Sequence, residues 1–312
     1  MTQTLDWPDI PFEPWSETCA ALHLFTQIVG KYRLAHSRWV NHSWHATLYV
    51  NATGFGTGLI PDGSGIAIQF DLQNSALIAS SGQGDQMQFA LEPMSVAKFD
   101  ARFKEMIAGL GGSPDYHGSP NELPQAIPFS EDVVERPWDA EAVSRFHTAL
   151  LKIDAVFNEF RTSFIGKVSP VHLFWGSFDL AVTRFSGRSA PAHPGGISNL
   201  PDDVTREAYS HEVSSAGFWP GGGGIDEPCF YSYAYPSPEG FGYASIEPGT
   251  AYFEPHLGEF LLKYDEVRKS EDPRASLLAF LSSTYRAAAD LGNWDSTDLE
   301  RPIGIIGRPH PI

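Results

Sequence analysis

The chain has 312 residues, of which 42% are hydrophobic and 19% charged, so it carries enough apolar material for a packed core and is not expected to be disordered over long stretches. Its formal net charge is −17, and a surface of that sign repels phosphate backbones, which excludes nucleic acid as an expected partner. The two cysteines, Cys19 and Cys229, are too few for a disulfide framework or a thiolate metal site.

The N-terminal residues are acidic and rich in proline, and they lack the apolar segment that is typical of a signal peptide. No other stretch approaches the ~18 apolar residues of a membrane-spanning helix. The sequence therefore predicts a cytoplasmic protein with no membrane segment.

In the first part of the chain, residues 17–34 place apolar side chains at helical spacing, with Ser16 as the candidate N-cap. A second helix is predicted to begin after Ser95. Between these helices, alternating apolar segments with glycine-containing turns predict an antiparallel meander. Its strands are expected at residues 47–55, 65–73, 75–81 and 87–92.

The second part of the chain begins with a predicted helix over residues 140–165, whose apolar stripe follows the candidate cap Asp139. A final helix is expected between Pro273, preceded by Asp272, and Gly292. Strands are predicted between these helices at residues 178–185, 230–236 and 243–247.

Weak similarities between the two parts recur in the same order along the chain, for example "TQIVGK" with "TSFIGK" and "HSWHATLYVNATGF" with "HLFWGSFDLAVTRF". We interpret them as an internal duplication with halves at residues 1–135 and 136–312, packed as one globular unit. Each half would contain a helix, an antiparallel sheet and a closing helix, which makes an α+β protein.

Two histidines, His42 and His45, lie three residues apart in "NHSWH". If these residues belong to a strand, as the following segment suggests, the two imidazoles point to opposite faces and do not share a metal. We assign no metal site, and the alternative is that His172 or His211 from elsewhere in the chain completes one. His42 is retained as a candidate acid or base and His45 as a candidate ligand-binding residue, beside the alternative that both are structural.

The stretch "SPVHLFWGSFDLAVTRFSGR" places His172, Trp175, Asp179 and Arg184 in and next to a predicted strand. Strand periodicity puts Asp179 on one face and Arg184 on the other. His172 is a candidate for proton transfer, and the other three residues are candidates for ligand binding. The alternative is that this polar face meets solvent and that Asp179 pairs with a basic residue.

A second polar stretch, "HEVSSAGFWPGGGG", begins with His211 and Glu212 and contains Trp219 before a glycine run. His211 and Glu212 resemble the start of a zinc-protease helix motif, but Ser215 stands where the second histidine belongs, so this chemistry is rejected. His211 and Glu212 remain a candidate acid–base pair. Trp219 is a candidate ligand-binding residue on a loop or lid.

Five sequence blocks resemble the signature of a bacterial family catalogued as a domain of unknown function. They are "TQIVGKYRLA", "NHSWHATLYV", "SPVHLFWGSFDLAVTRFSGR", "HEVSSAGFWPG" and "FYSYAYP". The resemblance extends over residues 14–300, and it implies no activity that could be transferred to this chain.

Taken together, these patterns favour a small-molecule-binding protein with a polar cleft between the two halves, because clefts between related units commonly hold ligands. Catalysis is left open, and neither a cofactor nor an oligomeric state follows from the sequence. The alternative hypothesis is a noncatalytic scaffold or interaction protein whose His, Asp and Arg side chains are structural.

Overall fold

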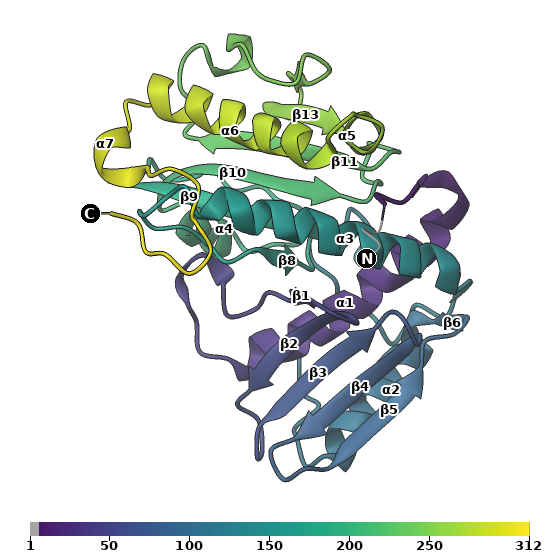
Figure 1. Ribbon diagram of the computed structural model, residues 1–312. Helices are drawn as coiled ribbons and strands as arrows, with labels where there is room; N and C mark the ends of the chain where they lie inside the picture. Colours follow the sequence, from purple (N-terminus) through teal and green to yellow (C-terminus); the bar gives the residue numbers. More distant parts are fainter. Residues whose placement is uncertain (1–5, 312) are drawn as a thin grey trace.

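The computed structural model describes residues 6–311 as a mixed α+β protein with antiparallel sheets (Figure 1). Its α-helices are α1 (Ser16–His36), α2 (Val96–Gly109), α3 (Ala140–Arg161), α4 (Asp202–Ala208), α5 (Tyr264–Arg268), α6 (Pro273–Leu291) and α7 (Ser296–Leu299). Short 3-10 helices are η1 (Glu13–Trp15), η2 (Asn41–Ser43) and η3 (Phe241–Tyr243). None of the helices within residues 6–311 is both long and apolar enough to cross a membrane.

The first sheet is a five-stranded meander in the order β1-β2-β3-β4-β5, against which α1 and α2 pack (Figure 1). Its strands are β1 (Tyr49–Asn51), β2 (Gly54–Ile60), β3 (Ile66–Asp71), β4 (Ala76–Ser81) and β5 (Gln86–Ala90). The rings of Phe25 from α1 and Phe99 from α2 stack at 4.1 Å between centroids, so aromatic packing joins the two helices.

The second sheet has six strands in the order β12-β13-β11-β10-β9-β8. These strands are β8 (His172–Phe174), β9 (Asp179–Ser189), β10 (His211–Trp219), β11 (Cys229–Tyr235), β12 (Tyr252–Glu254) and β13 (Glu259–Lys263). Helices α3 and α6 pack on each other and on this sheet (Figure 1). The face that they cover is mostly apolar, and Phe157 of α3 lies 6.4 Å from Phe230 of β11 between ring centroids.

The two sheets meet at one residue pair. Leu48, just before β1, and Leu173 of β8 exchange backbone hydrogen bonds of 2.9 and 2.8 Å in an antiparallel bridge. A separate two-stranded sheet, formed by β6 (Met94–Ser95) and β7 (Glu135–Arg136), ties the start of α2 to the segment before α3. The core is therefore continuous from one sheet to the other.

Local helix signals in the sequence are confirmed where a side chain caps its own helix. Ser95, Asp139 and Asp272 each accept a hydrogen bond from the backbone N–H three residues later, at 3.1, 2.9 and 3.0 Å. Ser16 is different, because Trp15 occupies the N-cap position and Ser16 is the first helical residue. Its hydroxyl donates back to the Glu13 carbonyl at 3.0 Å instead.

Two strand predictions are wrong, and one strand was not predicted. Residues 47–55 do not form one strand but the hairpin β1–β2, because the Asn51 side chain accepts hydrogen bonds from the backbone N–H groups of Thr53 and Gly54 and turns the chain. Residues 243–247 form no strand, and β11 pairs with β13 instead. Residues His211–Trp219 form the inner strand β10, which the sequence analysis did not predict.

The order helix, antiparallel sheet, helix occurs in both parts of the described chain, as α1, β1–β5, α2 and then α3, β8–β13, α6. The two sheets differ in strand number and in strand order. The internal duplication and the boundary at residues 135–136 therefore remain predictions.

The contact that fixes α1 against the second sheet is made by Trp175, in the β8–β9 connection. Its ring lies so close to Gly30 of α1 that a Cβ atom there would stand 2.3 Å from it. The indole N–H donates to the Ala46 carbonyl at 2.7 Å, and only 7% of the residue is exposed. Trp175 thus holds α1, the segment before β1 and the second sheet together.

We predict that Gly30→Ala destabilises the protein by ~1–3 kcal/mol because the new methyl group overpacks the Trp175 ring. The direction of the stability change tests the packing, because Gly→Ala in an unconstrained helix interior stabilises a protein by ~1 kcal/mol. Urea unfolding monitored by circular dichroism measures the change, with Gly118→Ala as the control because Gly118 faces open space. An equal or higher urea midpoint for Gly30→Ala would contradict the packing argument.

Candidate functional site

The polar residues of β9 are divided between its two faces. Arg184 lies on the side of α3 and α6, where its guanidinium stacks 3.5 Å from the Phe160 ring and 4.3 Å from the Tyr285 ring. It also donates to the Phe160 carbonyl and to Ser163 Oγ, the latter at 2.8 Å. Asp179 lies on the opposite side, where it contacts Tyr231. The structure therefore does not bring Arg184 and Asp179 into one site.

His42 lies in the turn η2, not in a strand, and has φ of 60°. Its Nδ1–H donates to the Ala208 carbonyl at 2.7 Å, and its Nε2 accepts from Lys167 Nζ at 2.5 Å. The imidazole of His211 lies 6.2 Å away between ring centroids. Burial, followed by the charge of Lys167, lowers the pKa of His42, which keeps this imidazole neutral.

Residues His211 and Glu212 are neighbours in β10 and do not form a pair. The Glu212 carboxylate accepts from Ser186 Oγ at 2.8 Å and from two nitrogens of Arg188 at 2.9 and 2.6 Å. The His211 ring instead lies 3.1 Å from Ser210 Oγ. Glu212 therefore forms an ion pair with Arg188 at the end of the sheet.

The face of the second sheet that lies away from α3 and α6 gathers carboxyl and phenol groups from distant parts of the chain. We call Glu122, Asp179, Tyr231 and Glu259 the carboxylate–tyrosine cluster. Asp179 belongs to β9, Tyr231 to β11 and Glu259 to β13, whereas Glu122 comes from the long connection between α2 and α3. Charge interactions of Asp179 with both glutamates place the three carboxyl groups in one neighbourhood.

Asp179 and Tyr231 meet across the intervening strand β10. The Tyr231 hydroxyl donates to one carboxylate oxygen of Asp179, and Ser177 Oγ donates to the other at 2.5 Å. The Tyr231 ring passes over Gly217, where a Cβ atom would stand 2.3 Å from it. Gly217 is therefore required for this contact, which leaves Asp179 only 4% exposed.

Helix α1 positions Glu122. The Gln27 amide bonds both backbone groups of Asn121, accepting from its N–H at 2.8 Å and donating to its carbonyl at 2.9 Å. Glu122 follows with φ of 61°, and its carboxylate lies against Gly176, where a Cβ atom would stand 1.9 Å from Oε1. Lys31 of α1 donates to the Asn121 side chain.

Glu259 completes the cluster from β13. It lies two residues before Leu261, which pairs with Tyr231, so both side chains share the Tyr231 face of the sheet. Its Oε2 atom is shielded from solvent and has no hydrogen-bond partner among the residues that the structure describes. A buried carboxyl oxygen without a partner is uncommon in folded proteins, and a water molecule, an ion or a ligand can supply the missing contact.

Burial and mutual repulsion make the two glutamates weak acids. Burial, and then the Asp179 carboxylate, raises the pKa of Glu122 to about 7, although Lys31 acts in the opposite direction. The same two causes raise the pKa of Glu259 to about 8. Burial also raises the pKa of Asp179, against the hydrogen bonds from Ser177 and Tyr231. Near neutral pH the two glutamates can therefore take up or release protons.

Aromatic side chains surround the cluster. The Trp219 ring lies 4.5 Å from that of Tyr231, and Tyr233 stacks on Tyr231 at 6.0 Å. The hydroxyls of Tyr209 and Tyr233 lie 2.8 Å apart. Trp219 is thus the last residue of strand β10 and packs on the cluster, rather than belonging to a loop.

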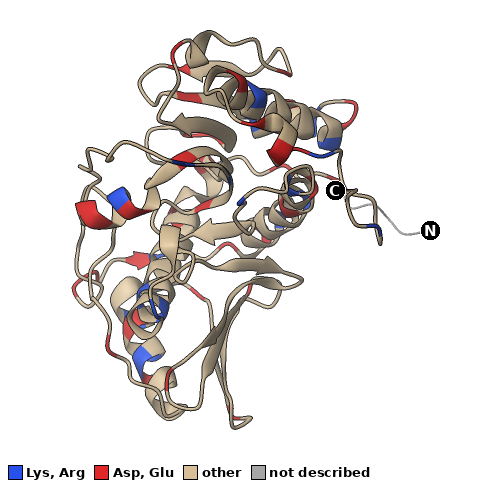
Figure 2. Ribbon diagram, turned by 90° about the vertical axis from the view of Figure 1, so that its left-hand side faces the viewer, with Lys and Arg blue, Asp and Glu red and all other residues tan. Residues whose placement is uncertain are grey.

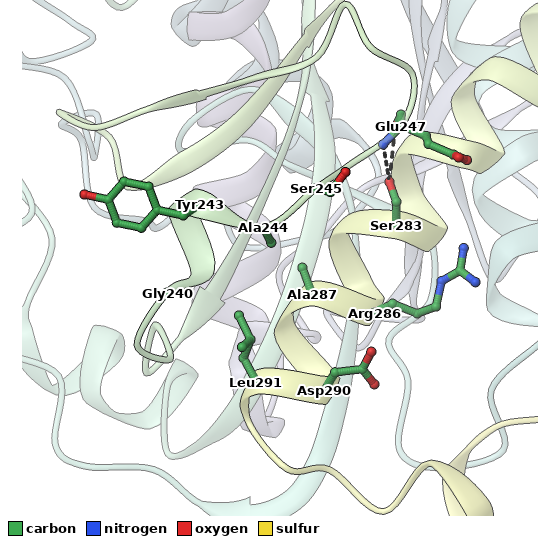
Figure 3. Close-up of a pocket in the computed structure, with 10 residues that line it drawn as sticks. All are labelled: Gly240, Tyr243, Ala244, Ser245, Glu247, Ser283, Arg286, Ala287, Asp290 and Leu291. Atoms are coloured by element: carbon green, nitrogen blue, oxygen red, sulfur yellow. Dashed lines mark hydrogen bonds between the residues drawn. The ribbon is translucent and has the colours of Figure 1, made fainter.

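A surface groove lies elsewhere, between the η3 segment and α6 (Figure 3). Within it the Ser283 hydroxyl is already bonded to both backbone groups of Glu247 (Figure 3). Arg286 and Asp290 extend from α6 away from the Tyr243 side of the groove (Figure 3). This groove lacks converging polar groups, so we place the candidate site at the carboxylate–tyrosine cluster.

The sequence analysis identified Asp179 and Trp219 but missed the other members of the site. The alternation of tyrosines in "FYSYAYP" was a usable signal, because residues two apart on a strand share a face. Glu259 in the apolar segment "EFLLK" was a weaker one. Glu122 had no signal, because a long connection and helix α1 bring it to the sheet. Within residues 6–311 no His, Cys, Asp or Glu groups are arranged to hold a metal ion.

The chain is a mixed α+β protein, and its candidate site is a partly buried group of acidic side chains beside one face of the larger sheet. The chain belongs to a family described as "Family of unknown function (DUF5996)", whose model matches residues 7–301. No curated protein and no solved structure matches the chain. The comparisons therefore give the family of the chain but no activity.

We predict that Glu122→Gln raises stability at alkaline pH. Because the folded-state pKa of Glu122 lies above the ordinary 4.5, folding holds its proton more tightly, and stability is lost as pH rises from about 4.5 to about 7. The neutral amide avoids this loss. Thermal unfolding should show a gain on the order of 2 kcal/mol at about pH 8.5 and little change at about pH 5.

The control is Glu105→Gln, which alters an exposed carboxylate of α2. It should show no such pH-dependent gain. The same difference in stability between Glu122→Gln and the wild-type protein at both pH values would contradict this expectation.

Proposed function

We propose that the chain binds a small cationic molecule, a protonated amine, at the carboxylate–tyrosine cluster. The observation that carries this proposal is the placement of Asp179 and Glu259 on the Tyr231 face of the sheet, with Glu122 against Gly176 and within range of the Asp179 charge, which raises the pKa of both glutamates. The ionised forms of these groups repel one another, and a cation between them would replace that repulsion with attraction. The free Oε2 of Glu259 supplies an acceptor for an ammonium N–H.

The aromatic residues support the same class of ligand. Tyr231 and Tyr233 stack beside Asp179, and Trp219 packs on Tyr231. The faces of tyrosine and tryptophan rings attract ammonium groups, and such contacts gain strength where water is excluded. A cage of carboxyl and aromatic groups therefore fits an amine better than an anion or a purely apolar molecule.

Protonation would be linked to binding. At neutral pH Glu259 is mostly protonated and Glu122 partly protonated, because their pKa values lie at about 8 and about 7. An ammonium ion favours the ionised carboxylates, so its arrival would displace protons into solvent. Affinity should consequently rise with pH while the amine itself remains protonated.

A second candidate function is acid–base catalysis, favoured by two carboxylic acids that titrate near neutral pH beside a hydrogen-bonded carboxyl group. Under this alternative a bound molecule would be chemically changed. Mass spectrometry of amines incubated with the protein would distinguish turnover from simple binding.

We predict saturable binding of at least one alkylamine from a panel of mono- and diamines tested by isothermal titration calorimetry. Matched alcohols, such as 1-butanol for n-butylammonium, should not bind. Asp179→Asn keeps the shape of the side chain but removes its charge, and should lower the affinity for the amine by about 10-fold or more. The binding enthalpy of the wild-type protein should vary with the ionisation enthalpy of the buffer.

The matched control is Asp203→Asn in α4, whose carboxylate side chain is 97% exposed and lies away from the cluster. It should leave amine binding unchanged. Equal binding of the alcohols, or wild-type affinity in Asp179→Asn, would contradict the proposal. The absence of binding throughout the panel would favour a scaffold whose polar residues are structural.

A further inference from the structure

Basic side chains gather near the place where the two sheets meet. We call Arg33 of α1, His45, Arg161 of α3 and His172 of β8 the basic cluster. The Arg33 guanidinium lies 5.6 Å from the Tyr49 ring, and the Tyr49 ring lies 6.4 Å from the His172 ring. Charge interactions of His172 with both arginines, and of His45 with Arg33, connect the four side chains.

Each member of the basic cluster has a nitrogen that is shielded from solvent and unbonded within residues 6–311. These atoms are Arg33 Nη1, His45 Nε2, Arg161 Nε, and both ring nitrogens of His172. His172 is fully buried, with 0% exposure. Leaving one buried polar group unsatisfied costs ~1–3 kcal/mol, so this many in one place requires an explanation.

The free nitrogens are mostly hydrogen-bond donors. Arginine nitrogens only donate. Nδ1 of His45 lies 3.1 Å from the Val40 backbone nitrogen and 3.3 Å from the Val40 carbonyl oxygen, so the free Nε2 is a donor in one tautomer and an acceptor in the other. Burial, and then the charges of Arg161 and Arg33, lowers the pKa of His172 to about 3, so its ring is neutral and offers one N–H. The basic cluster thus offers several N–H donors, and its two arginines make it positively charged.

Acidic groups do not neutralise the two arginines by direct contact. In the part of the chain that the structure describes, neither Arg33 nor Arg161 has an ion pair within 4.0 Å. Arg161 donates to Asn158 Oδ1 at 3.2 Å, and the negative charge of Asp154 acts on it at longer range. This is unusual in a chain of formal net charge −17, whose acidic residues are spread over many elements (Figure 2).

We propose that the basic cluster is a binding site for a small oxyanion, a carboxylate or phosphate group. Its oxygens would accept from the free nitrogens of Arg33 and Arg161, from the one N–H of His172, and from His45 in the tautomer that protonates Nε2. Arginine forks suit both anions, because their N–H groups match the spacing of two oxygens. This site is separate from the carboxylate–tyrosine cluster and does not depend on the amine proposal.

The test is a titration of the wild-type protein with inorganic phosphate and, separately, with acetate, at constant ionic strength so that general screening stays fixed. Nuclear magnetic resonance of ¹⁵N-histidine-labelled protein would follow the ring nitrogens of His172. We expect a saturable shift of the His172 signals with one of the anions. A response to phosphate alone identifies a phosphate site, and a response to acetate alone identifies a carboxylate site.

Arg33→Gln and Arg161→Gln should each lower the affinity for the anion by at least about 10-fold. Arg145→Gln is the matched control, because Arg145 lies on the exposed side of α3 beside Glu141 and outside the cluster. Asp179→Asn should leave anion binding unchanged, which separates this result from failure of the amine proposal. If neither anion shifts His172 in the wild-type protein, the proposal is overturned whether or not the variants fold.

Discussion

One side of helix α1 positions the candidate site through hydrogen bonds to the backbone. His23 Nε2–H donates to the carbonyls of Trp175 and Gly176 at 3.0 and 2.9 Å, and Gln27 pairs with the backbone of Asn121. Burial lowers the pKa of His23 to about 4, so this contact stays uncharged at neutral pH. Two loops distant in sequence are thereby held on the same helix, and they set Glu122 beside Asp179.

The loops are held by groups other than the carboxyl groups themselves, and this explains how the fold tolerates carboxyl groups that repel one another. The groups that hold the loops are neutral amides, carbonyls and an imidazole, whose hydrogen bonds do not weaken when the carboxylates titrate. Packing supplies the rest, through Trp175 against Gly30. The scaffold can therefore keep the carboxyl groups close although their charged forms oppose folding, as strained or repulsive groups at functional sites commonly do.

Sequence reasoning succeeded where structure is set by neighbours in the chain. Asp139 and Asp272 cap helices by bonding residues three positions ahead, so their role is visible in the sequence. Strand β10 was missed because its segment "HEVSSAGFW" carries small and polar residues in place of a regular alternation of large apolar ones. Asp179 was noticed because an acidic residue within a strand is unusual. Glu122 reaches it only through tertiary contacts, which no local pattern encodes.

The passage of the Tyr231 ring over Gly217 gives the family a marker that sequence comparison can use. Any side chain at this position would occupy the space of the ring and separate the phenol from Asp179. A tyrosine on β11 is therefore informative only together with a glycine at the facing position of β10, with which it pairs directly. Members of the family that keep both residues can form this contact, and members with a larger residue in place of the glycine must use that face of the sheet differently.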